Sequence, residues 1–191
     1  KTASGLPSSS FDSPDPEDLW TSLAKYEART GGQVLAIPHN GNLSNGMMFE
    51  RKRINGSAFD ADYASMRARW EPLVEVTQIK GDGETHPKLS PDDEFADYES
   101  WDTANLGGSE AKTDDMLEGE YARSALGLGL QVEADTGVNP YRFGMIGSTD
   151  SHTALATSRE ENFFGKHSGM EPTPTQQDCE RSSTPSKRRW S

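Results

Sequence analysis

The sequence is poor in cysteine, in basic residues and in long apolar runs. Its single cysteine, Cys179, excludes an intrachain disulfide and a zinc cluster built from cysteines. The 19 Lys and Arg residues face 31 Asp and Glu residues, so the formal net charge is −12. Such acidity disfavours nucleic acids and anionic membrane surfaces as partners. No apolar run approaches the roughly 20 residues of a membrane span. We therefore expect a soluble protein of the cytoplasm or the periplasm, with no nucleic-acid and no membrane partner.

Polar segments take up much of the chain. Hydrophobic residues make up only 32% of the 191 residues, so part of the chain is expected to be disordered. Residues 1–14, rich in Ser, Pro and Gly, predict a linker or loop, and the acidic residues 88–115 predict a solvated loop. Residues 171–191 lack an apolar period and predict a disordered basic tail, unless a frameshift produced them. Residues 15–170 remain for a folded domain.

Helical and strand patterns alternate along this domain. A capping carboxylate and a proline at Asp15-Pro16 predict the start of a helix, which Gly31-Gly32 ends. Short apolar or alternating runs predict buried strands. The alternation favours an α/β fold with parallel strands and right-handed crossovers, as part of a barrel or of an open sheet. The predicted elements are helices from Pro16 up to Gly31, Asp60 to Trp70 and Glu118 to Leu130, and strands at Val34–Ile37, Leu73–Ile79 and Phe143–Ile146.

Polar residues with potential for chemistry follow each predicted strand. His39 and Asn40 come after the first strand, His86 after the second, and Asp150 and His152 after the third. Because parallel strands end on the same side of a sheet, these residues are expected to share one rim. Carboxylate and neutral imidazole are ordinary ligands of zinc, manganese or iron, which favours a metal site. A plain turn at Asp150 is the alternative, and His86 is equally compatible with a ligand, a substrate-anion contact and loop surface.

Three motifs resemble the later motifs of the polymerase and histidinol phosphatase (PHP) superfamily. They are Ile37-Pro-His-Asn40, Glu75-Val-Thr-Gln-Ile and Gly147-Ser-Thr-Asp-Ser-His152, and the resemblance covers roughly residues 15–172. It is closer to an uncharacterised bacterial branch that also carries Gly-Asp-Xaa-Glu-Thr-His-Pro, which includes His86 here. The resemblance implies a distorted seven-stranded TIM-like β/α barrel that holds two or three divalent metal ions and hydrolyses phosphate esters.

Carried over by position, the resemblance assigns roles to single residues. His39, Asp150 and His152 would be metal ligands. His86 has no secure counterpart in the wider superfamily; as a separate hypothesis, we expect Asn40 and His86 to orient an anionic small-molecule substrate. Glu75 matches a family glutamate that is not a dependable ligand.

The sequence also departs from the family pattern. No histidine precedes His39, so the His-Xaa-His motif of the first strand and the further early ligands are absent. The chain is therefore expected to be the C-terminal part of a phosphoesterase-type hydrolase domain that lacks its N-terminal half. Such a part would bind metal weakly and be nearly inactive. The alternatives are a non-catalytic remnant or interaction module, and a metal-dependent hydrolase of amides or sulfate esters.

Overall fold

The computed structural model describes residues 8–150 of the chain. It divides the chain into two units, Lys1–Gly147 and Ser148–Ser191. The first unit contains every helix and strand given below, whereas only residues 148–150 of the second unit are described. Among the described residues, no helix is long and apolar enough to span a bilayer.

The first two helices begin and end where the sequence predicts. Helix α1 spans Pro16–Thr30, with the Asp15 side chain accepting a hydrogen bond from the Glu17 amide at 2.9 Å. Gly31 ends α1 in the left-handed conformation (φ 71°), which glycine adopts without steric penalty. Helix α2 spans Ala61–Trp70. Local capping therefore determines both helices, and the predicted ranges are confirmed.

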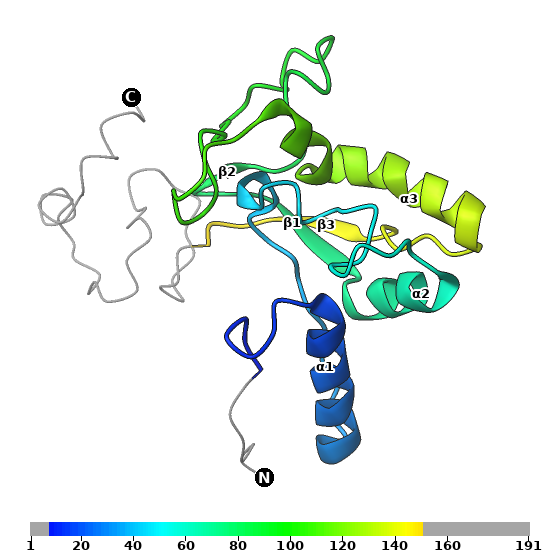
Figure 1. Ribbon diagram of the computed structural model, residues 1–191. Coiled ribbons are helices and arrows are strands. Elements are labelled where there is room, and N and C mark those ends of the chain that lie inside the picture. The colour runs from blue at the N-terminus through cyan, green and yellow to red at the C-terminus, as the bar shows by residue number, and fades with distance from the viewer. Residues whose placement is uncertain (1–7, 151–191) are drawn as a thin grey trace, which may run out of the picture. The chain divides into compact units, whose positions relative to one another are not determined.

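A small open sheet lies beside these helices (Figure 1). Its strands are β1 (Leu73–Gln78), β2 (Gly81–Asp82) and β3 (Gly144–Gly147), in the order β2-β1-β3. Strands β1 and β3 pair in parallel, with Leu73 opposite Gly144 and Thr77 opposite Gly147. The predicted second and third strands and their parallel direction are confirmed. The fold of the described residues is mixed α/β with an open sheet, and these residues do not close into a barrel.

The predicted strand at Val34–Ile37 is wrong. Two isolated backbone hydrogen bonds hold the segment, one from the Ala36 amide to the Trp70 carbonyl at the end of α2 (2.8 Å) and one from the Glu75 amide of β1 to the Pro38 carbonyl (3.0 Å). Pro38 has no N–H to donate, so a continuous ladder cannot form there. The segment nevertheless runs along the edge of β1, which brings His39 to the end of that strand.

The predicted helix at Glu118–Leu130 begins too early and ends too early. Helix α3 spans Ala122–Thr136, and Glu118 belongs to the preceding 3₁₀-helix η2 (Asp114–Gly119). Gly127 and Gly129 lie in the interior of α3 rather than at its end. Tertiary packing overrides their low helix propensity, because α3 buries its apolar face in the core.

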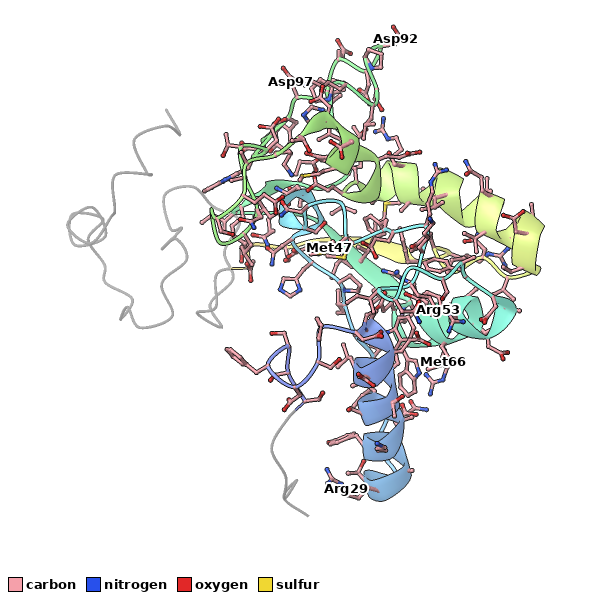
Figure 2. The ribbon with its side chains drawn as sticks, in the orientation of Figure 1. Arg29, Met47, Arg53, Met66, Asp92 and Asp97 are labelled. Atoms are coloured by element: carbon pink, nitrogen blue, oxygen red, sulfur yellow. The ribbon has the colours of Figure 1, made fainter. Side chains whose placement is uncertain are left out.

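One core joins all three long helices to one face of β1. Trp20 of α1 lies edge-on to Tyr63 of α2, with ring centroids 5.2 Å apart. The acidic loop lies outside this core, and Figure 2 shows Asp92 and Asp97 on it, away from the sheet. Both residues are exposed, as the prediction of a solvated loop requires. The buried cluster consists of Trp20, Phe49, Phe59, Tyr63, Ala64, Trp70, Val74, Ala122, Ala125, Leu128, Val132 and Tyr141.

A buried ion pair holds the elements around this core. Arg67 is 6% exposed, and its Nε lies 3.0 Å from Oε2 of Glu71, one helical turn later in α2. The same guanidinium donates to the Met48 carbonyl (2.6 Å) and to the Tyr141 hydroxyl (3.3 Å). The Glu71 carboxylate also accepts from the Trp20 indole N–H at 2.9 Å. Four segments distant in sequence therefore meet at one guanidinium–carboxylate pair.

Replacing Arg67 by Met should strongly destabilise the fold, because Glu71 would keep a buried charge without its cation. Removal of one partner of a buried pair costs about 3–5 kcal/mol. The matched control is Arg51→Met, which breaks the pair with Glu118, where both side chains are more than half exposed (54% and 61%). The control should change the free energy of unfolding by less than about 1 kcal/mol. Urea unfolding followed by tryptophan fluorescence measures both, and equal effects would contradict this account.

The two interior glycines of α3 should respond to alanine in opposite directions. A Cβ at Gly127 meets open space, so Gly127→Ala should stabilise by about 0.5–1 kcal/mol through helix propensity. A Cβ at Gly129 would overlap the Asn139 Oδ1, which is already held by the Tyr141 amide at 2.9 Å. Gly129→Ala should therefore destabilise. Thermal unfolding of the two variants tests this, and a shared sign would show that the close contact at Gly129 has no energetic weight.

Candidate functional site

A sharp turn follows the extended segment and places His39 and Asn40 at the end of β1. Asn40 has φ 63° and precedes the 3₁₀-helix η1 (Gly41–Leu43). A Cβ at Gly41 would lie 2.5 Å from the Glu120 carbonyl oxygen, so only glycine allows this approach. The buried Asn42 side chain donates to the Lys80 carbonyl at 3.0 Å and thereby ties the turn to the segment after β1.

The His39 imidazole is exposed, and one of its nitrogens faces a backbone carbonyl. Nδ1 lies 3.3 Å from the Ile37 carbonyl oxygen. A carbonyl oxygen only accepts hydrogen bonds, so this contact requires a proton on Nδ1, and in the neutral imidazole the lone pair is then on Nε2. The Nε2 lone pair is then directed away from the backbone. Metal-binding histidines are commonly oriented in this way, with the other ring N–H donating to a carbonyl or carboxylate.

Asn40 takes part in a polar cluster on β1. The Gln78 Nε2 donates to the Asn40 Oδ1 at 2.6 Å and to the Glu75 Oε2 at 3.2 Å. Glu75 and Gln78 are each 9% exposed, although both are polar. Sequence reasoning did not identify Gln78, because nothing in its neighbourhood in the sequence distinguishes it from any strand-end glutamine.

His86 is a buried structural residue rather than loop surface. It is 5% exposed, and its Nδ1 accepts from the Lys88 amide at 3.1 Å. Its Nε2 lies 2.9 Å from Oδ2 of Asp102, which requires the proton on Nε2. Neither nitrogen offers a lone pair to a metal, and neither donates outward. His86 therefore anchors the loop that follows β2, and its geometry offers no support for the predicted contact with substrate.

An aromatic ring and several carboxylates lie near His86, and one buried hydroxyl there lacks a hydrogen bond among the described residues. The Tyr121 ring packs against the imidazole at a centroid distance of 5.5 Å, and the buried Tyr121 hydroxyl has no hydrogen-bond partner among the described residues. Burial raises the pKa of Tyr121 far above its usual value, and nearby carboxylates add to the effect. Burial also raises the pKa of Asp82, while the amides of Thr85 and Glu84 act in the opposite direction. Tyr121 is thus a neutral hydroxyl at physiological pH.

The other two predicted ligands follow β3. Asp150 is the last described residue and has φ 49°, a left-handed conformation that Asp tolerates better than most residues. His152 lies outside the described residues. Among residues 8–150, no group of three or more His, Cys, Asp and Glu side chains is arranged to hold a metal ion. The predicted set of His39, Asp150 and His152 includes a residue beyond this range and stays a prediction.

Removing the carboxylate beside His86 should weaken the fold without changing metal binding. Asp102→Ala leaves the buried imidazole N–H unpaired, which costs about 1–3 kcal/mol, whereas Asp102→Asn can still accept through its amide oxygen. Asp97→Ala on the same exposed loop is the control and should stay within about 0.5 kcal/mol of wild type. Chemical unfolding and Mn²⁺ titration measure the two properties. A loss of Mn²⁺ affinity in a folded Asp102→Ala variant would contradict this account and would indicate that His86 contributes to metal binding.

Comparison with known proteins gives one family. A family described as "Protein of unknown function (DUF3604)" matches residues 1–190 of the chain. No curated protein and no solved structure gives a significant match. The match extends over almost the whole sequence, including both units, and the chain therefore belongs to the DUF3604 family.

Proposed function

We propose that the chain is part of a metal-dependent hydrolase of the phosphoesterase type, related to the PHP superfamily. The observation that carries this proposal is the hydrogen bonding and exposure of the His39 imidazole. Its Nδ1–H is directed to the Ile37 carbonyl, and its exposed Nε2 lone pair is available to a metal ion at the end of β1. His86 offers the internal contrast, since hydrogen bonds occupy both of its nitrogens.

The parallel pairing of β1 and β3 supports a shared site. Gly147 at the end of β3 lies opposite Thr77, and the neighbouring Gln78 binds Asn40. In the sequence, Asp150 and His152 follow Gly147 within five residues. Enzymes with parallel sheets place their chemistry at this end of the strands. The parallel pairing of β1 and β3 therefore supports the proposal that the chemistry lies at this end of the two strands.

The ligand set suits a divalent ion such as zinc, manganese or iron. It combines two neutral imidazoles, from His39 and His152, with the carboxylate of Asp150. A bound ion of this kind lowers the pKa of a coordinated water and neutralises phosphoryl oxygens. The chain's own contribution is to present the His39 Nε2 with its orientation set by the Ile37 carbonyl, and to hold the Asn40 amide beside it.

The open sheet is consistent with a proposed place in a distorted β/α barrel. Val74 faces the core formed with the helices, so Glu75 next to it in β1 points to the opposite face. The pairing of β1 with β3 is irregular between Glu75 and Thr77, and the Gln78 side chain, three residues after Glu75, donates to the Glu75 carboxylate and to Asn40. In a barrel with helices outside, the face away from the helices is the interior, where polar groups at the strand ends form active sites.

Calorimetric titration with Mn²⁺ and Zn²⁺ tests the ligand assignment. Single alanine variants of His39, Asp150 and His152 should each lower metal affinity by more than about tenfold, a loss that even indirect supporting residues of metal sites produce. His167→Ala, which removes the remaining histidine without a proposed role, should leave the affinity unchanged. Tight stoichiometric binding that none of the three ligand variants weakens would refute the assignment.

The reaction type needs a separate assay. The early ligands of the family are absent, so the metal-loaded chain should show only trace activity. That trace activity should be higher on an aryl phosphate than on the matched aryl sulfate and aryl amide, and Asp150→Ala should abolish it. Preferential cleavage of the sulfate or the amide would retain the metal site and replace the phosphoesterase assignment.

A further inference from the structure

The backbone after β1 determines which way the Gln78 amide faces. The Lys80 amide N–H donates to the Gln78 Oε1 at 2.9 Å. A backbone N–H can only donate, so the oxygen of Gln78 must face Lys80 and its nitrogen must lie on the other side. Gln78 is 9% exposed, so a reversed amide would face the Lys80 donor with its own N–H groups in a largely buried site.

The orientation of the Gln78 amide also determines the orientation of the Asn40 side-chain amide. The Gln78 Nε2 lies 2.6 Å from Asn40 and 3.2 Å from the Glu75 Oε2. The nitrogen can only donate, so Asn40 must turn its oxygen toward Gln78 and its Nδ2 amino group away. Among the described residues, Asn40 Nδ2 donates to no protein acceptor. Two successive hydrogen bonds, from the Lys80 amide to Gln78 and from Gln78 to Asn40, thus leave the two N–H donors of the Asn40 Nδ2, next to His39 in the sequence, on the side away from Gln78.

We propose that Gln78 is a positioning residue that presents the Asn40 Nδ2 as a donor for an oxygen of a tetrahedral anion. This deepens the proposed function, on which it rests, by giving the bound group its chemistry. An asparagine would bind a metal through Oδ1, and Gln78 already uses one of the two lone pairs of that atom, whereas Nδ2 can only donate. The donor therefore selects an anionic oxygen, such as a phosphoryl oxygen, over a cation.

The turn itself does not account for this arrangement. Asn40 has φ 63°, a conformation that asparagine tolerates and glycine adopts without penalty. The turn needs only a residue of that kind, and it does not require the contact of 2.6 Å with a buried Gln78. Asn40→Gly therefore removes the side chain and keeps the backbone, which separates the two roles. Asn45 has a similar conformation, with φ 54°; it is half-buried, donates to the Glu110 carboxylate, and provides a matched control.

The test measures inorganic phosphate binding to the 191-residue chain by calorimetry, with and without Mn²⁺. Asn40→Gly should lower phosphate affinity roughly tenfold or more, the usual effect of losing a hydrogen bond to a charged group. Asn45→Gly should leave it unchanged, and both variants should unfold at temperatures close to wild type. Phosphate should also shift the ¹H–¹⁵N signals of the Asn40 side-chain amide, which Asn40→Gly identifies by their disappearance.

Gln78→Glu tests the direction of the hydrogen bonds. A carboxylate cannot donate to Asn40, so the Asn40 amide should turn its nitrogen toward residue 78 and its oxygen outward. Phosphate affinity should then fall as in Asn40→Gly, while Mn²⁺ affinity stays the same or rises. A variant with a purely structural defect would lose both. Should Gln78→Glu fail to fold, Gln78→Met removes the donor without adding charge and should also weaken phosphate binding.

The outcomes separate this inference from the proposed function. Phosphate binding that is absent in wild type, or unchanged in Asn40→Gly, overturns the role of Asn40 and Gln78 whatever the metal titrations give. Phosphate binding that depends on Asn40, together with metal binding that ignores Asp150 and His152, upholds this inference and refutes the metal site. Equal Asn40 dependence for sulfate and phosphate supports recognition of tetrahedral anions in general.

Discussion

The buried pair of Arg67 and Glu71 is the interaction on which the described fold depends. It joins α1 through Trp20, the loop before α2 through Met48, and the segment before β3 through Tyr141. Two buried charges are tolerated because nearly every polar atom of the pair has a partner, which offsets the loss of hydration. The Tyr141 contact also matters for the sheet, since Tyr141 lies three residues before β3 and holds the approach of that strand to β1.

Hydrogen-bond polarity, more than residue type, distinguishes the candidate site from its surroundings. His39 and His86 are both histidines outside the helices and strands, yet a carbonyl faces one and an amide faces the other. The first leaves a lone pair exposed, and the second uses it inside the fold. The same rule extends to Asn40, where Gln78 fixes which atom of the amide faces outward. Backbone groups of fixed polarity thus decide which side-chain atoms the hydrogen bonds of the fold leave unused.

Local chemistry made part of the fold predictable. The Asp15 cap, the left-handed Gly31 and the alternation in Leu73–Ile79 depend on neighbours within a few residues, so α1 and β1 were predicted correctly. The prediction failed where distant contacts decide. Helix α3 continues beyond Gly127 and Gly129 because Leu128 and Val132 of the helix are buried in the core. The segment before Pro38 forms no strand because its backbone hydrogen bonds to β1 are interrupted.

The sequence by itself determined the candidate residue types at the strand ends, since His39, Asn40 and Asp150 follow apolar runs that are recognisable in isolation. Only the tertiary structure decided what the side chains can do. The burial of His86 against Asp102 and the orientation of Asn40 by Gln78 join residues 16 and 38 positions apart. No local pattern encodes such pairs, because the energy that fixes them comes from polar groups that must find partners once the fold excludes water.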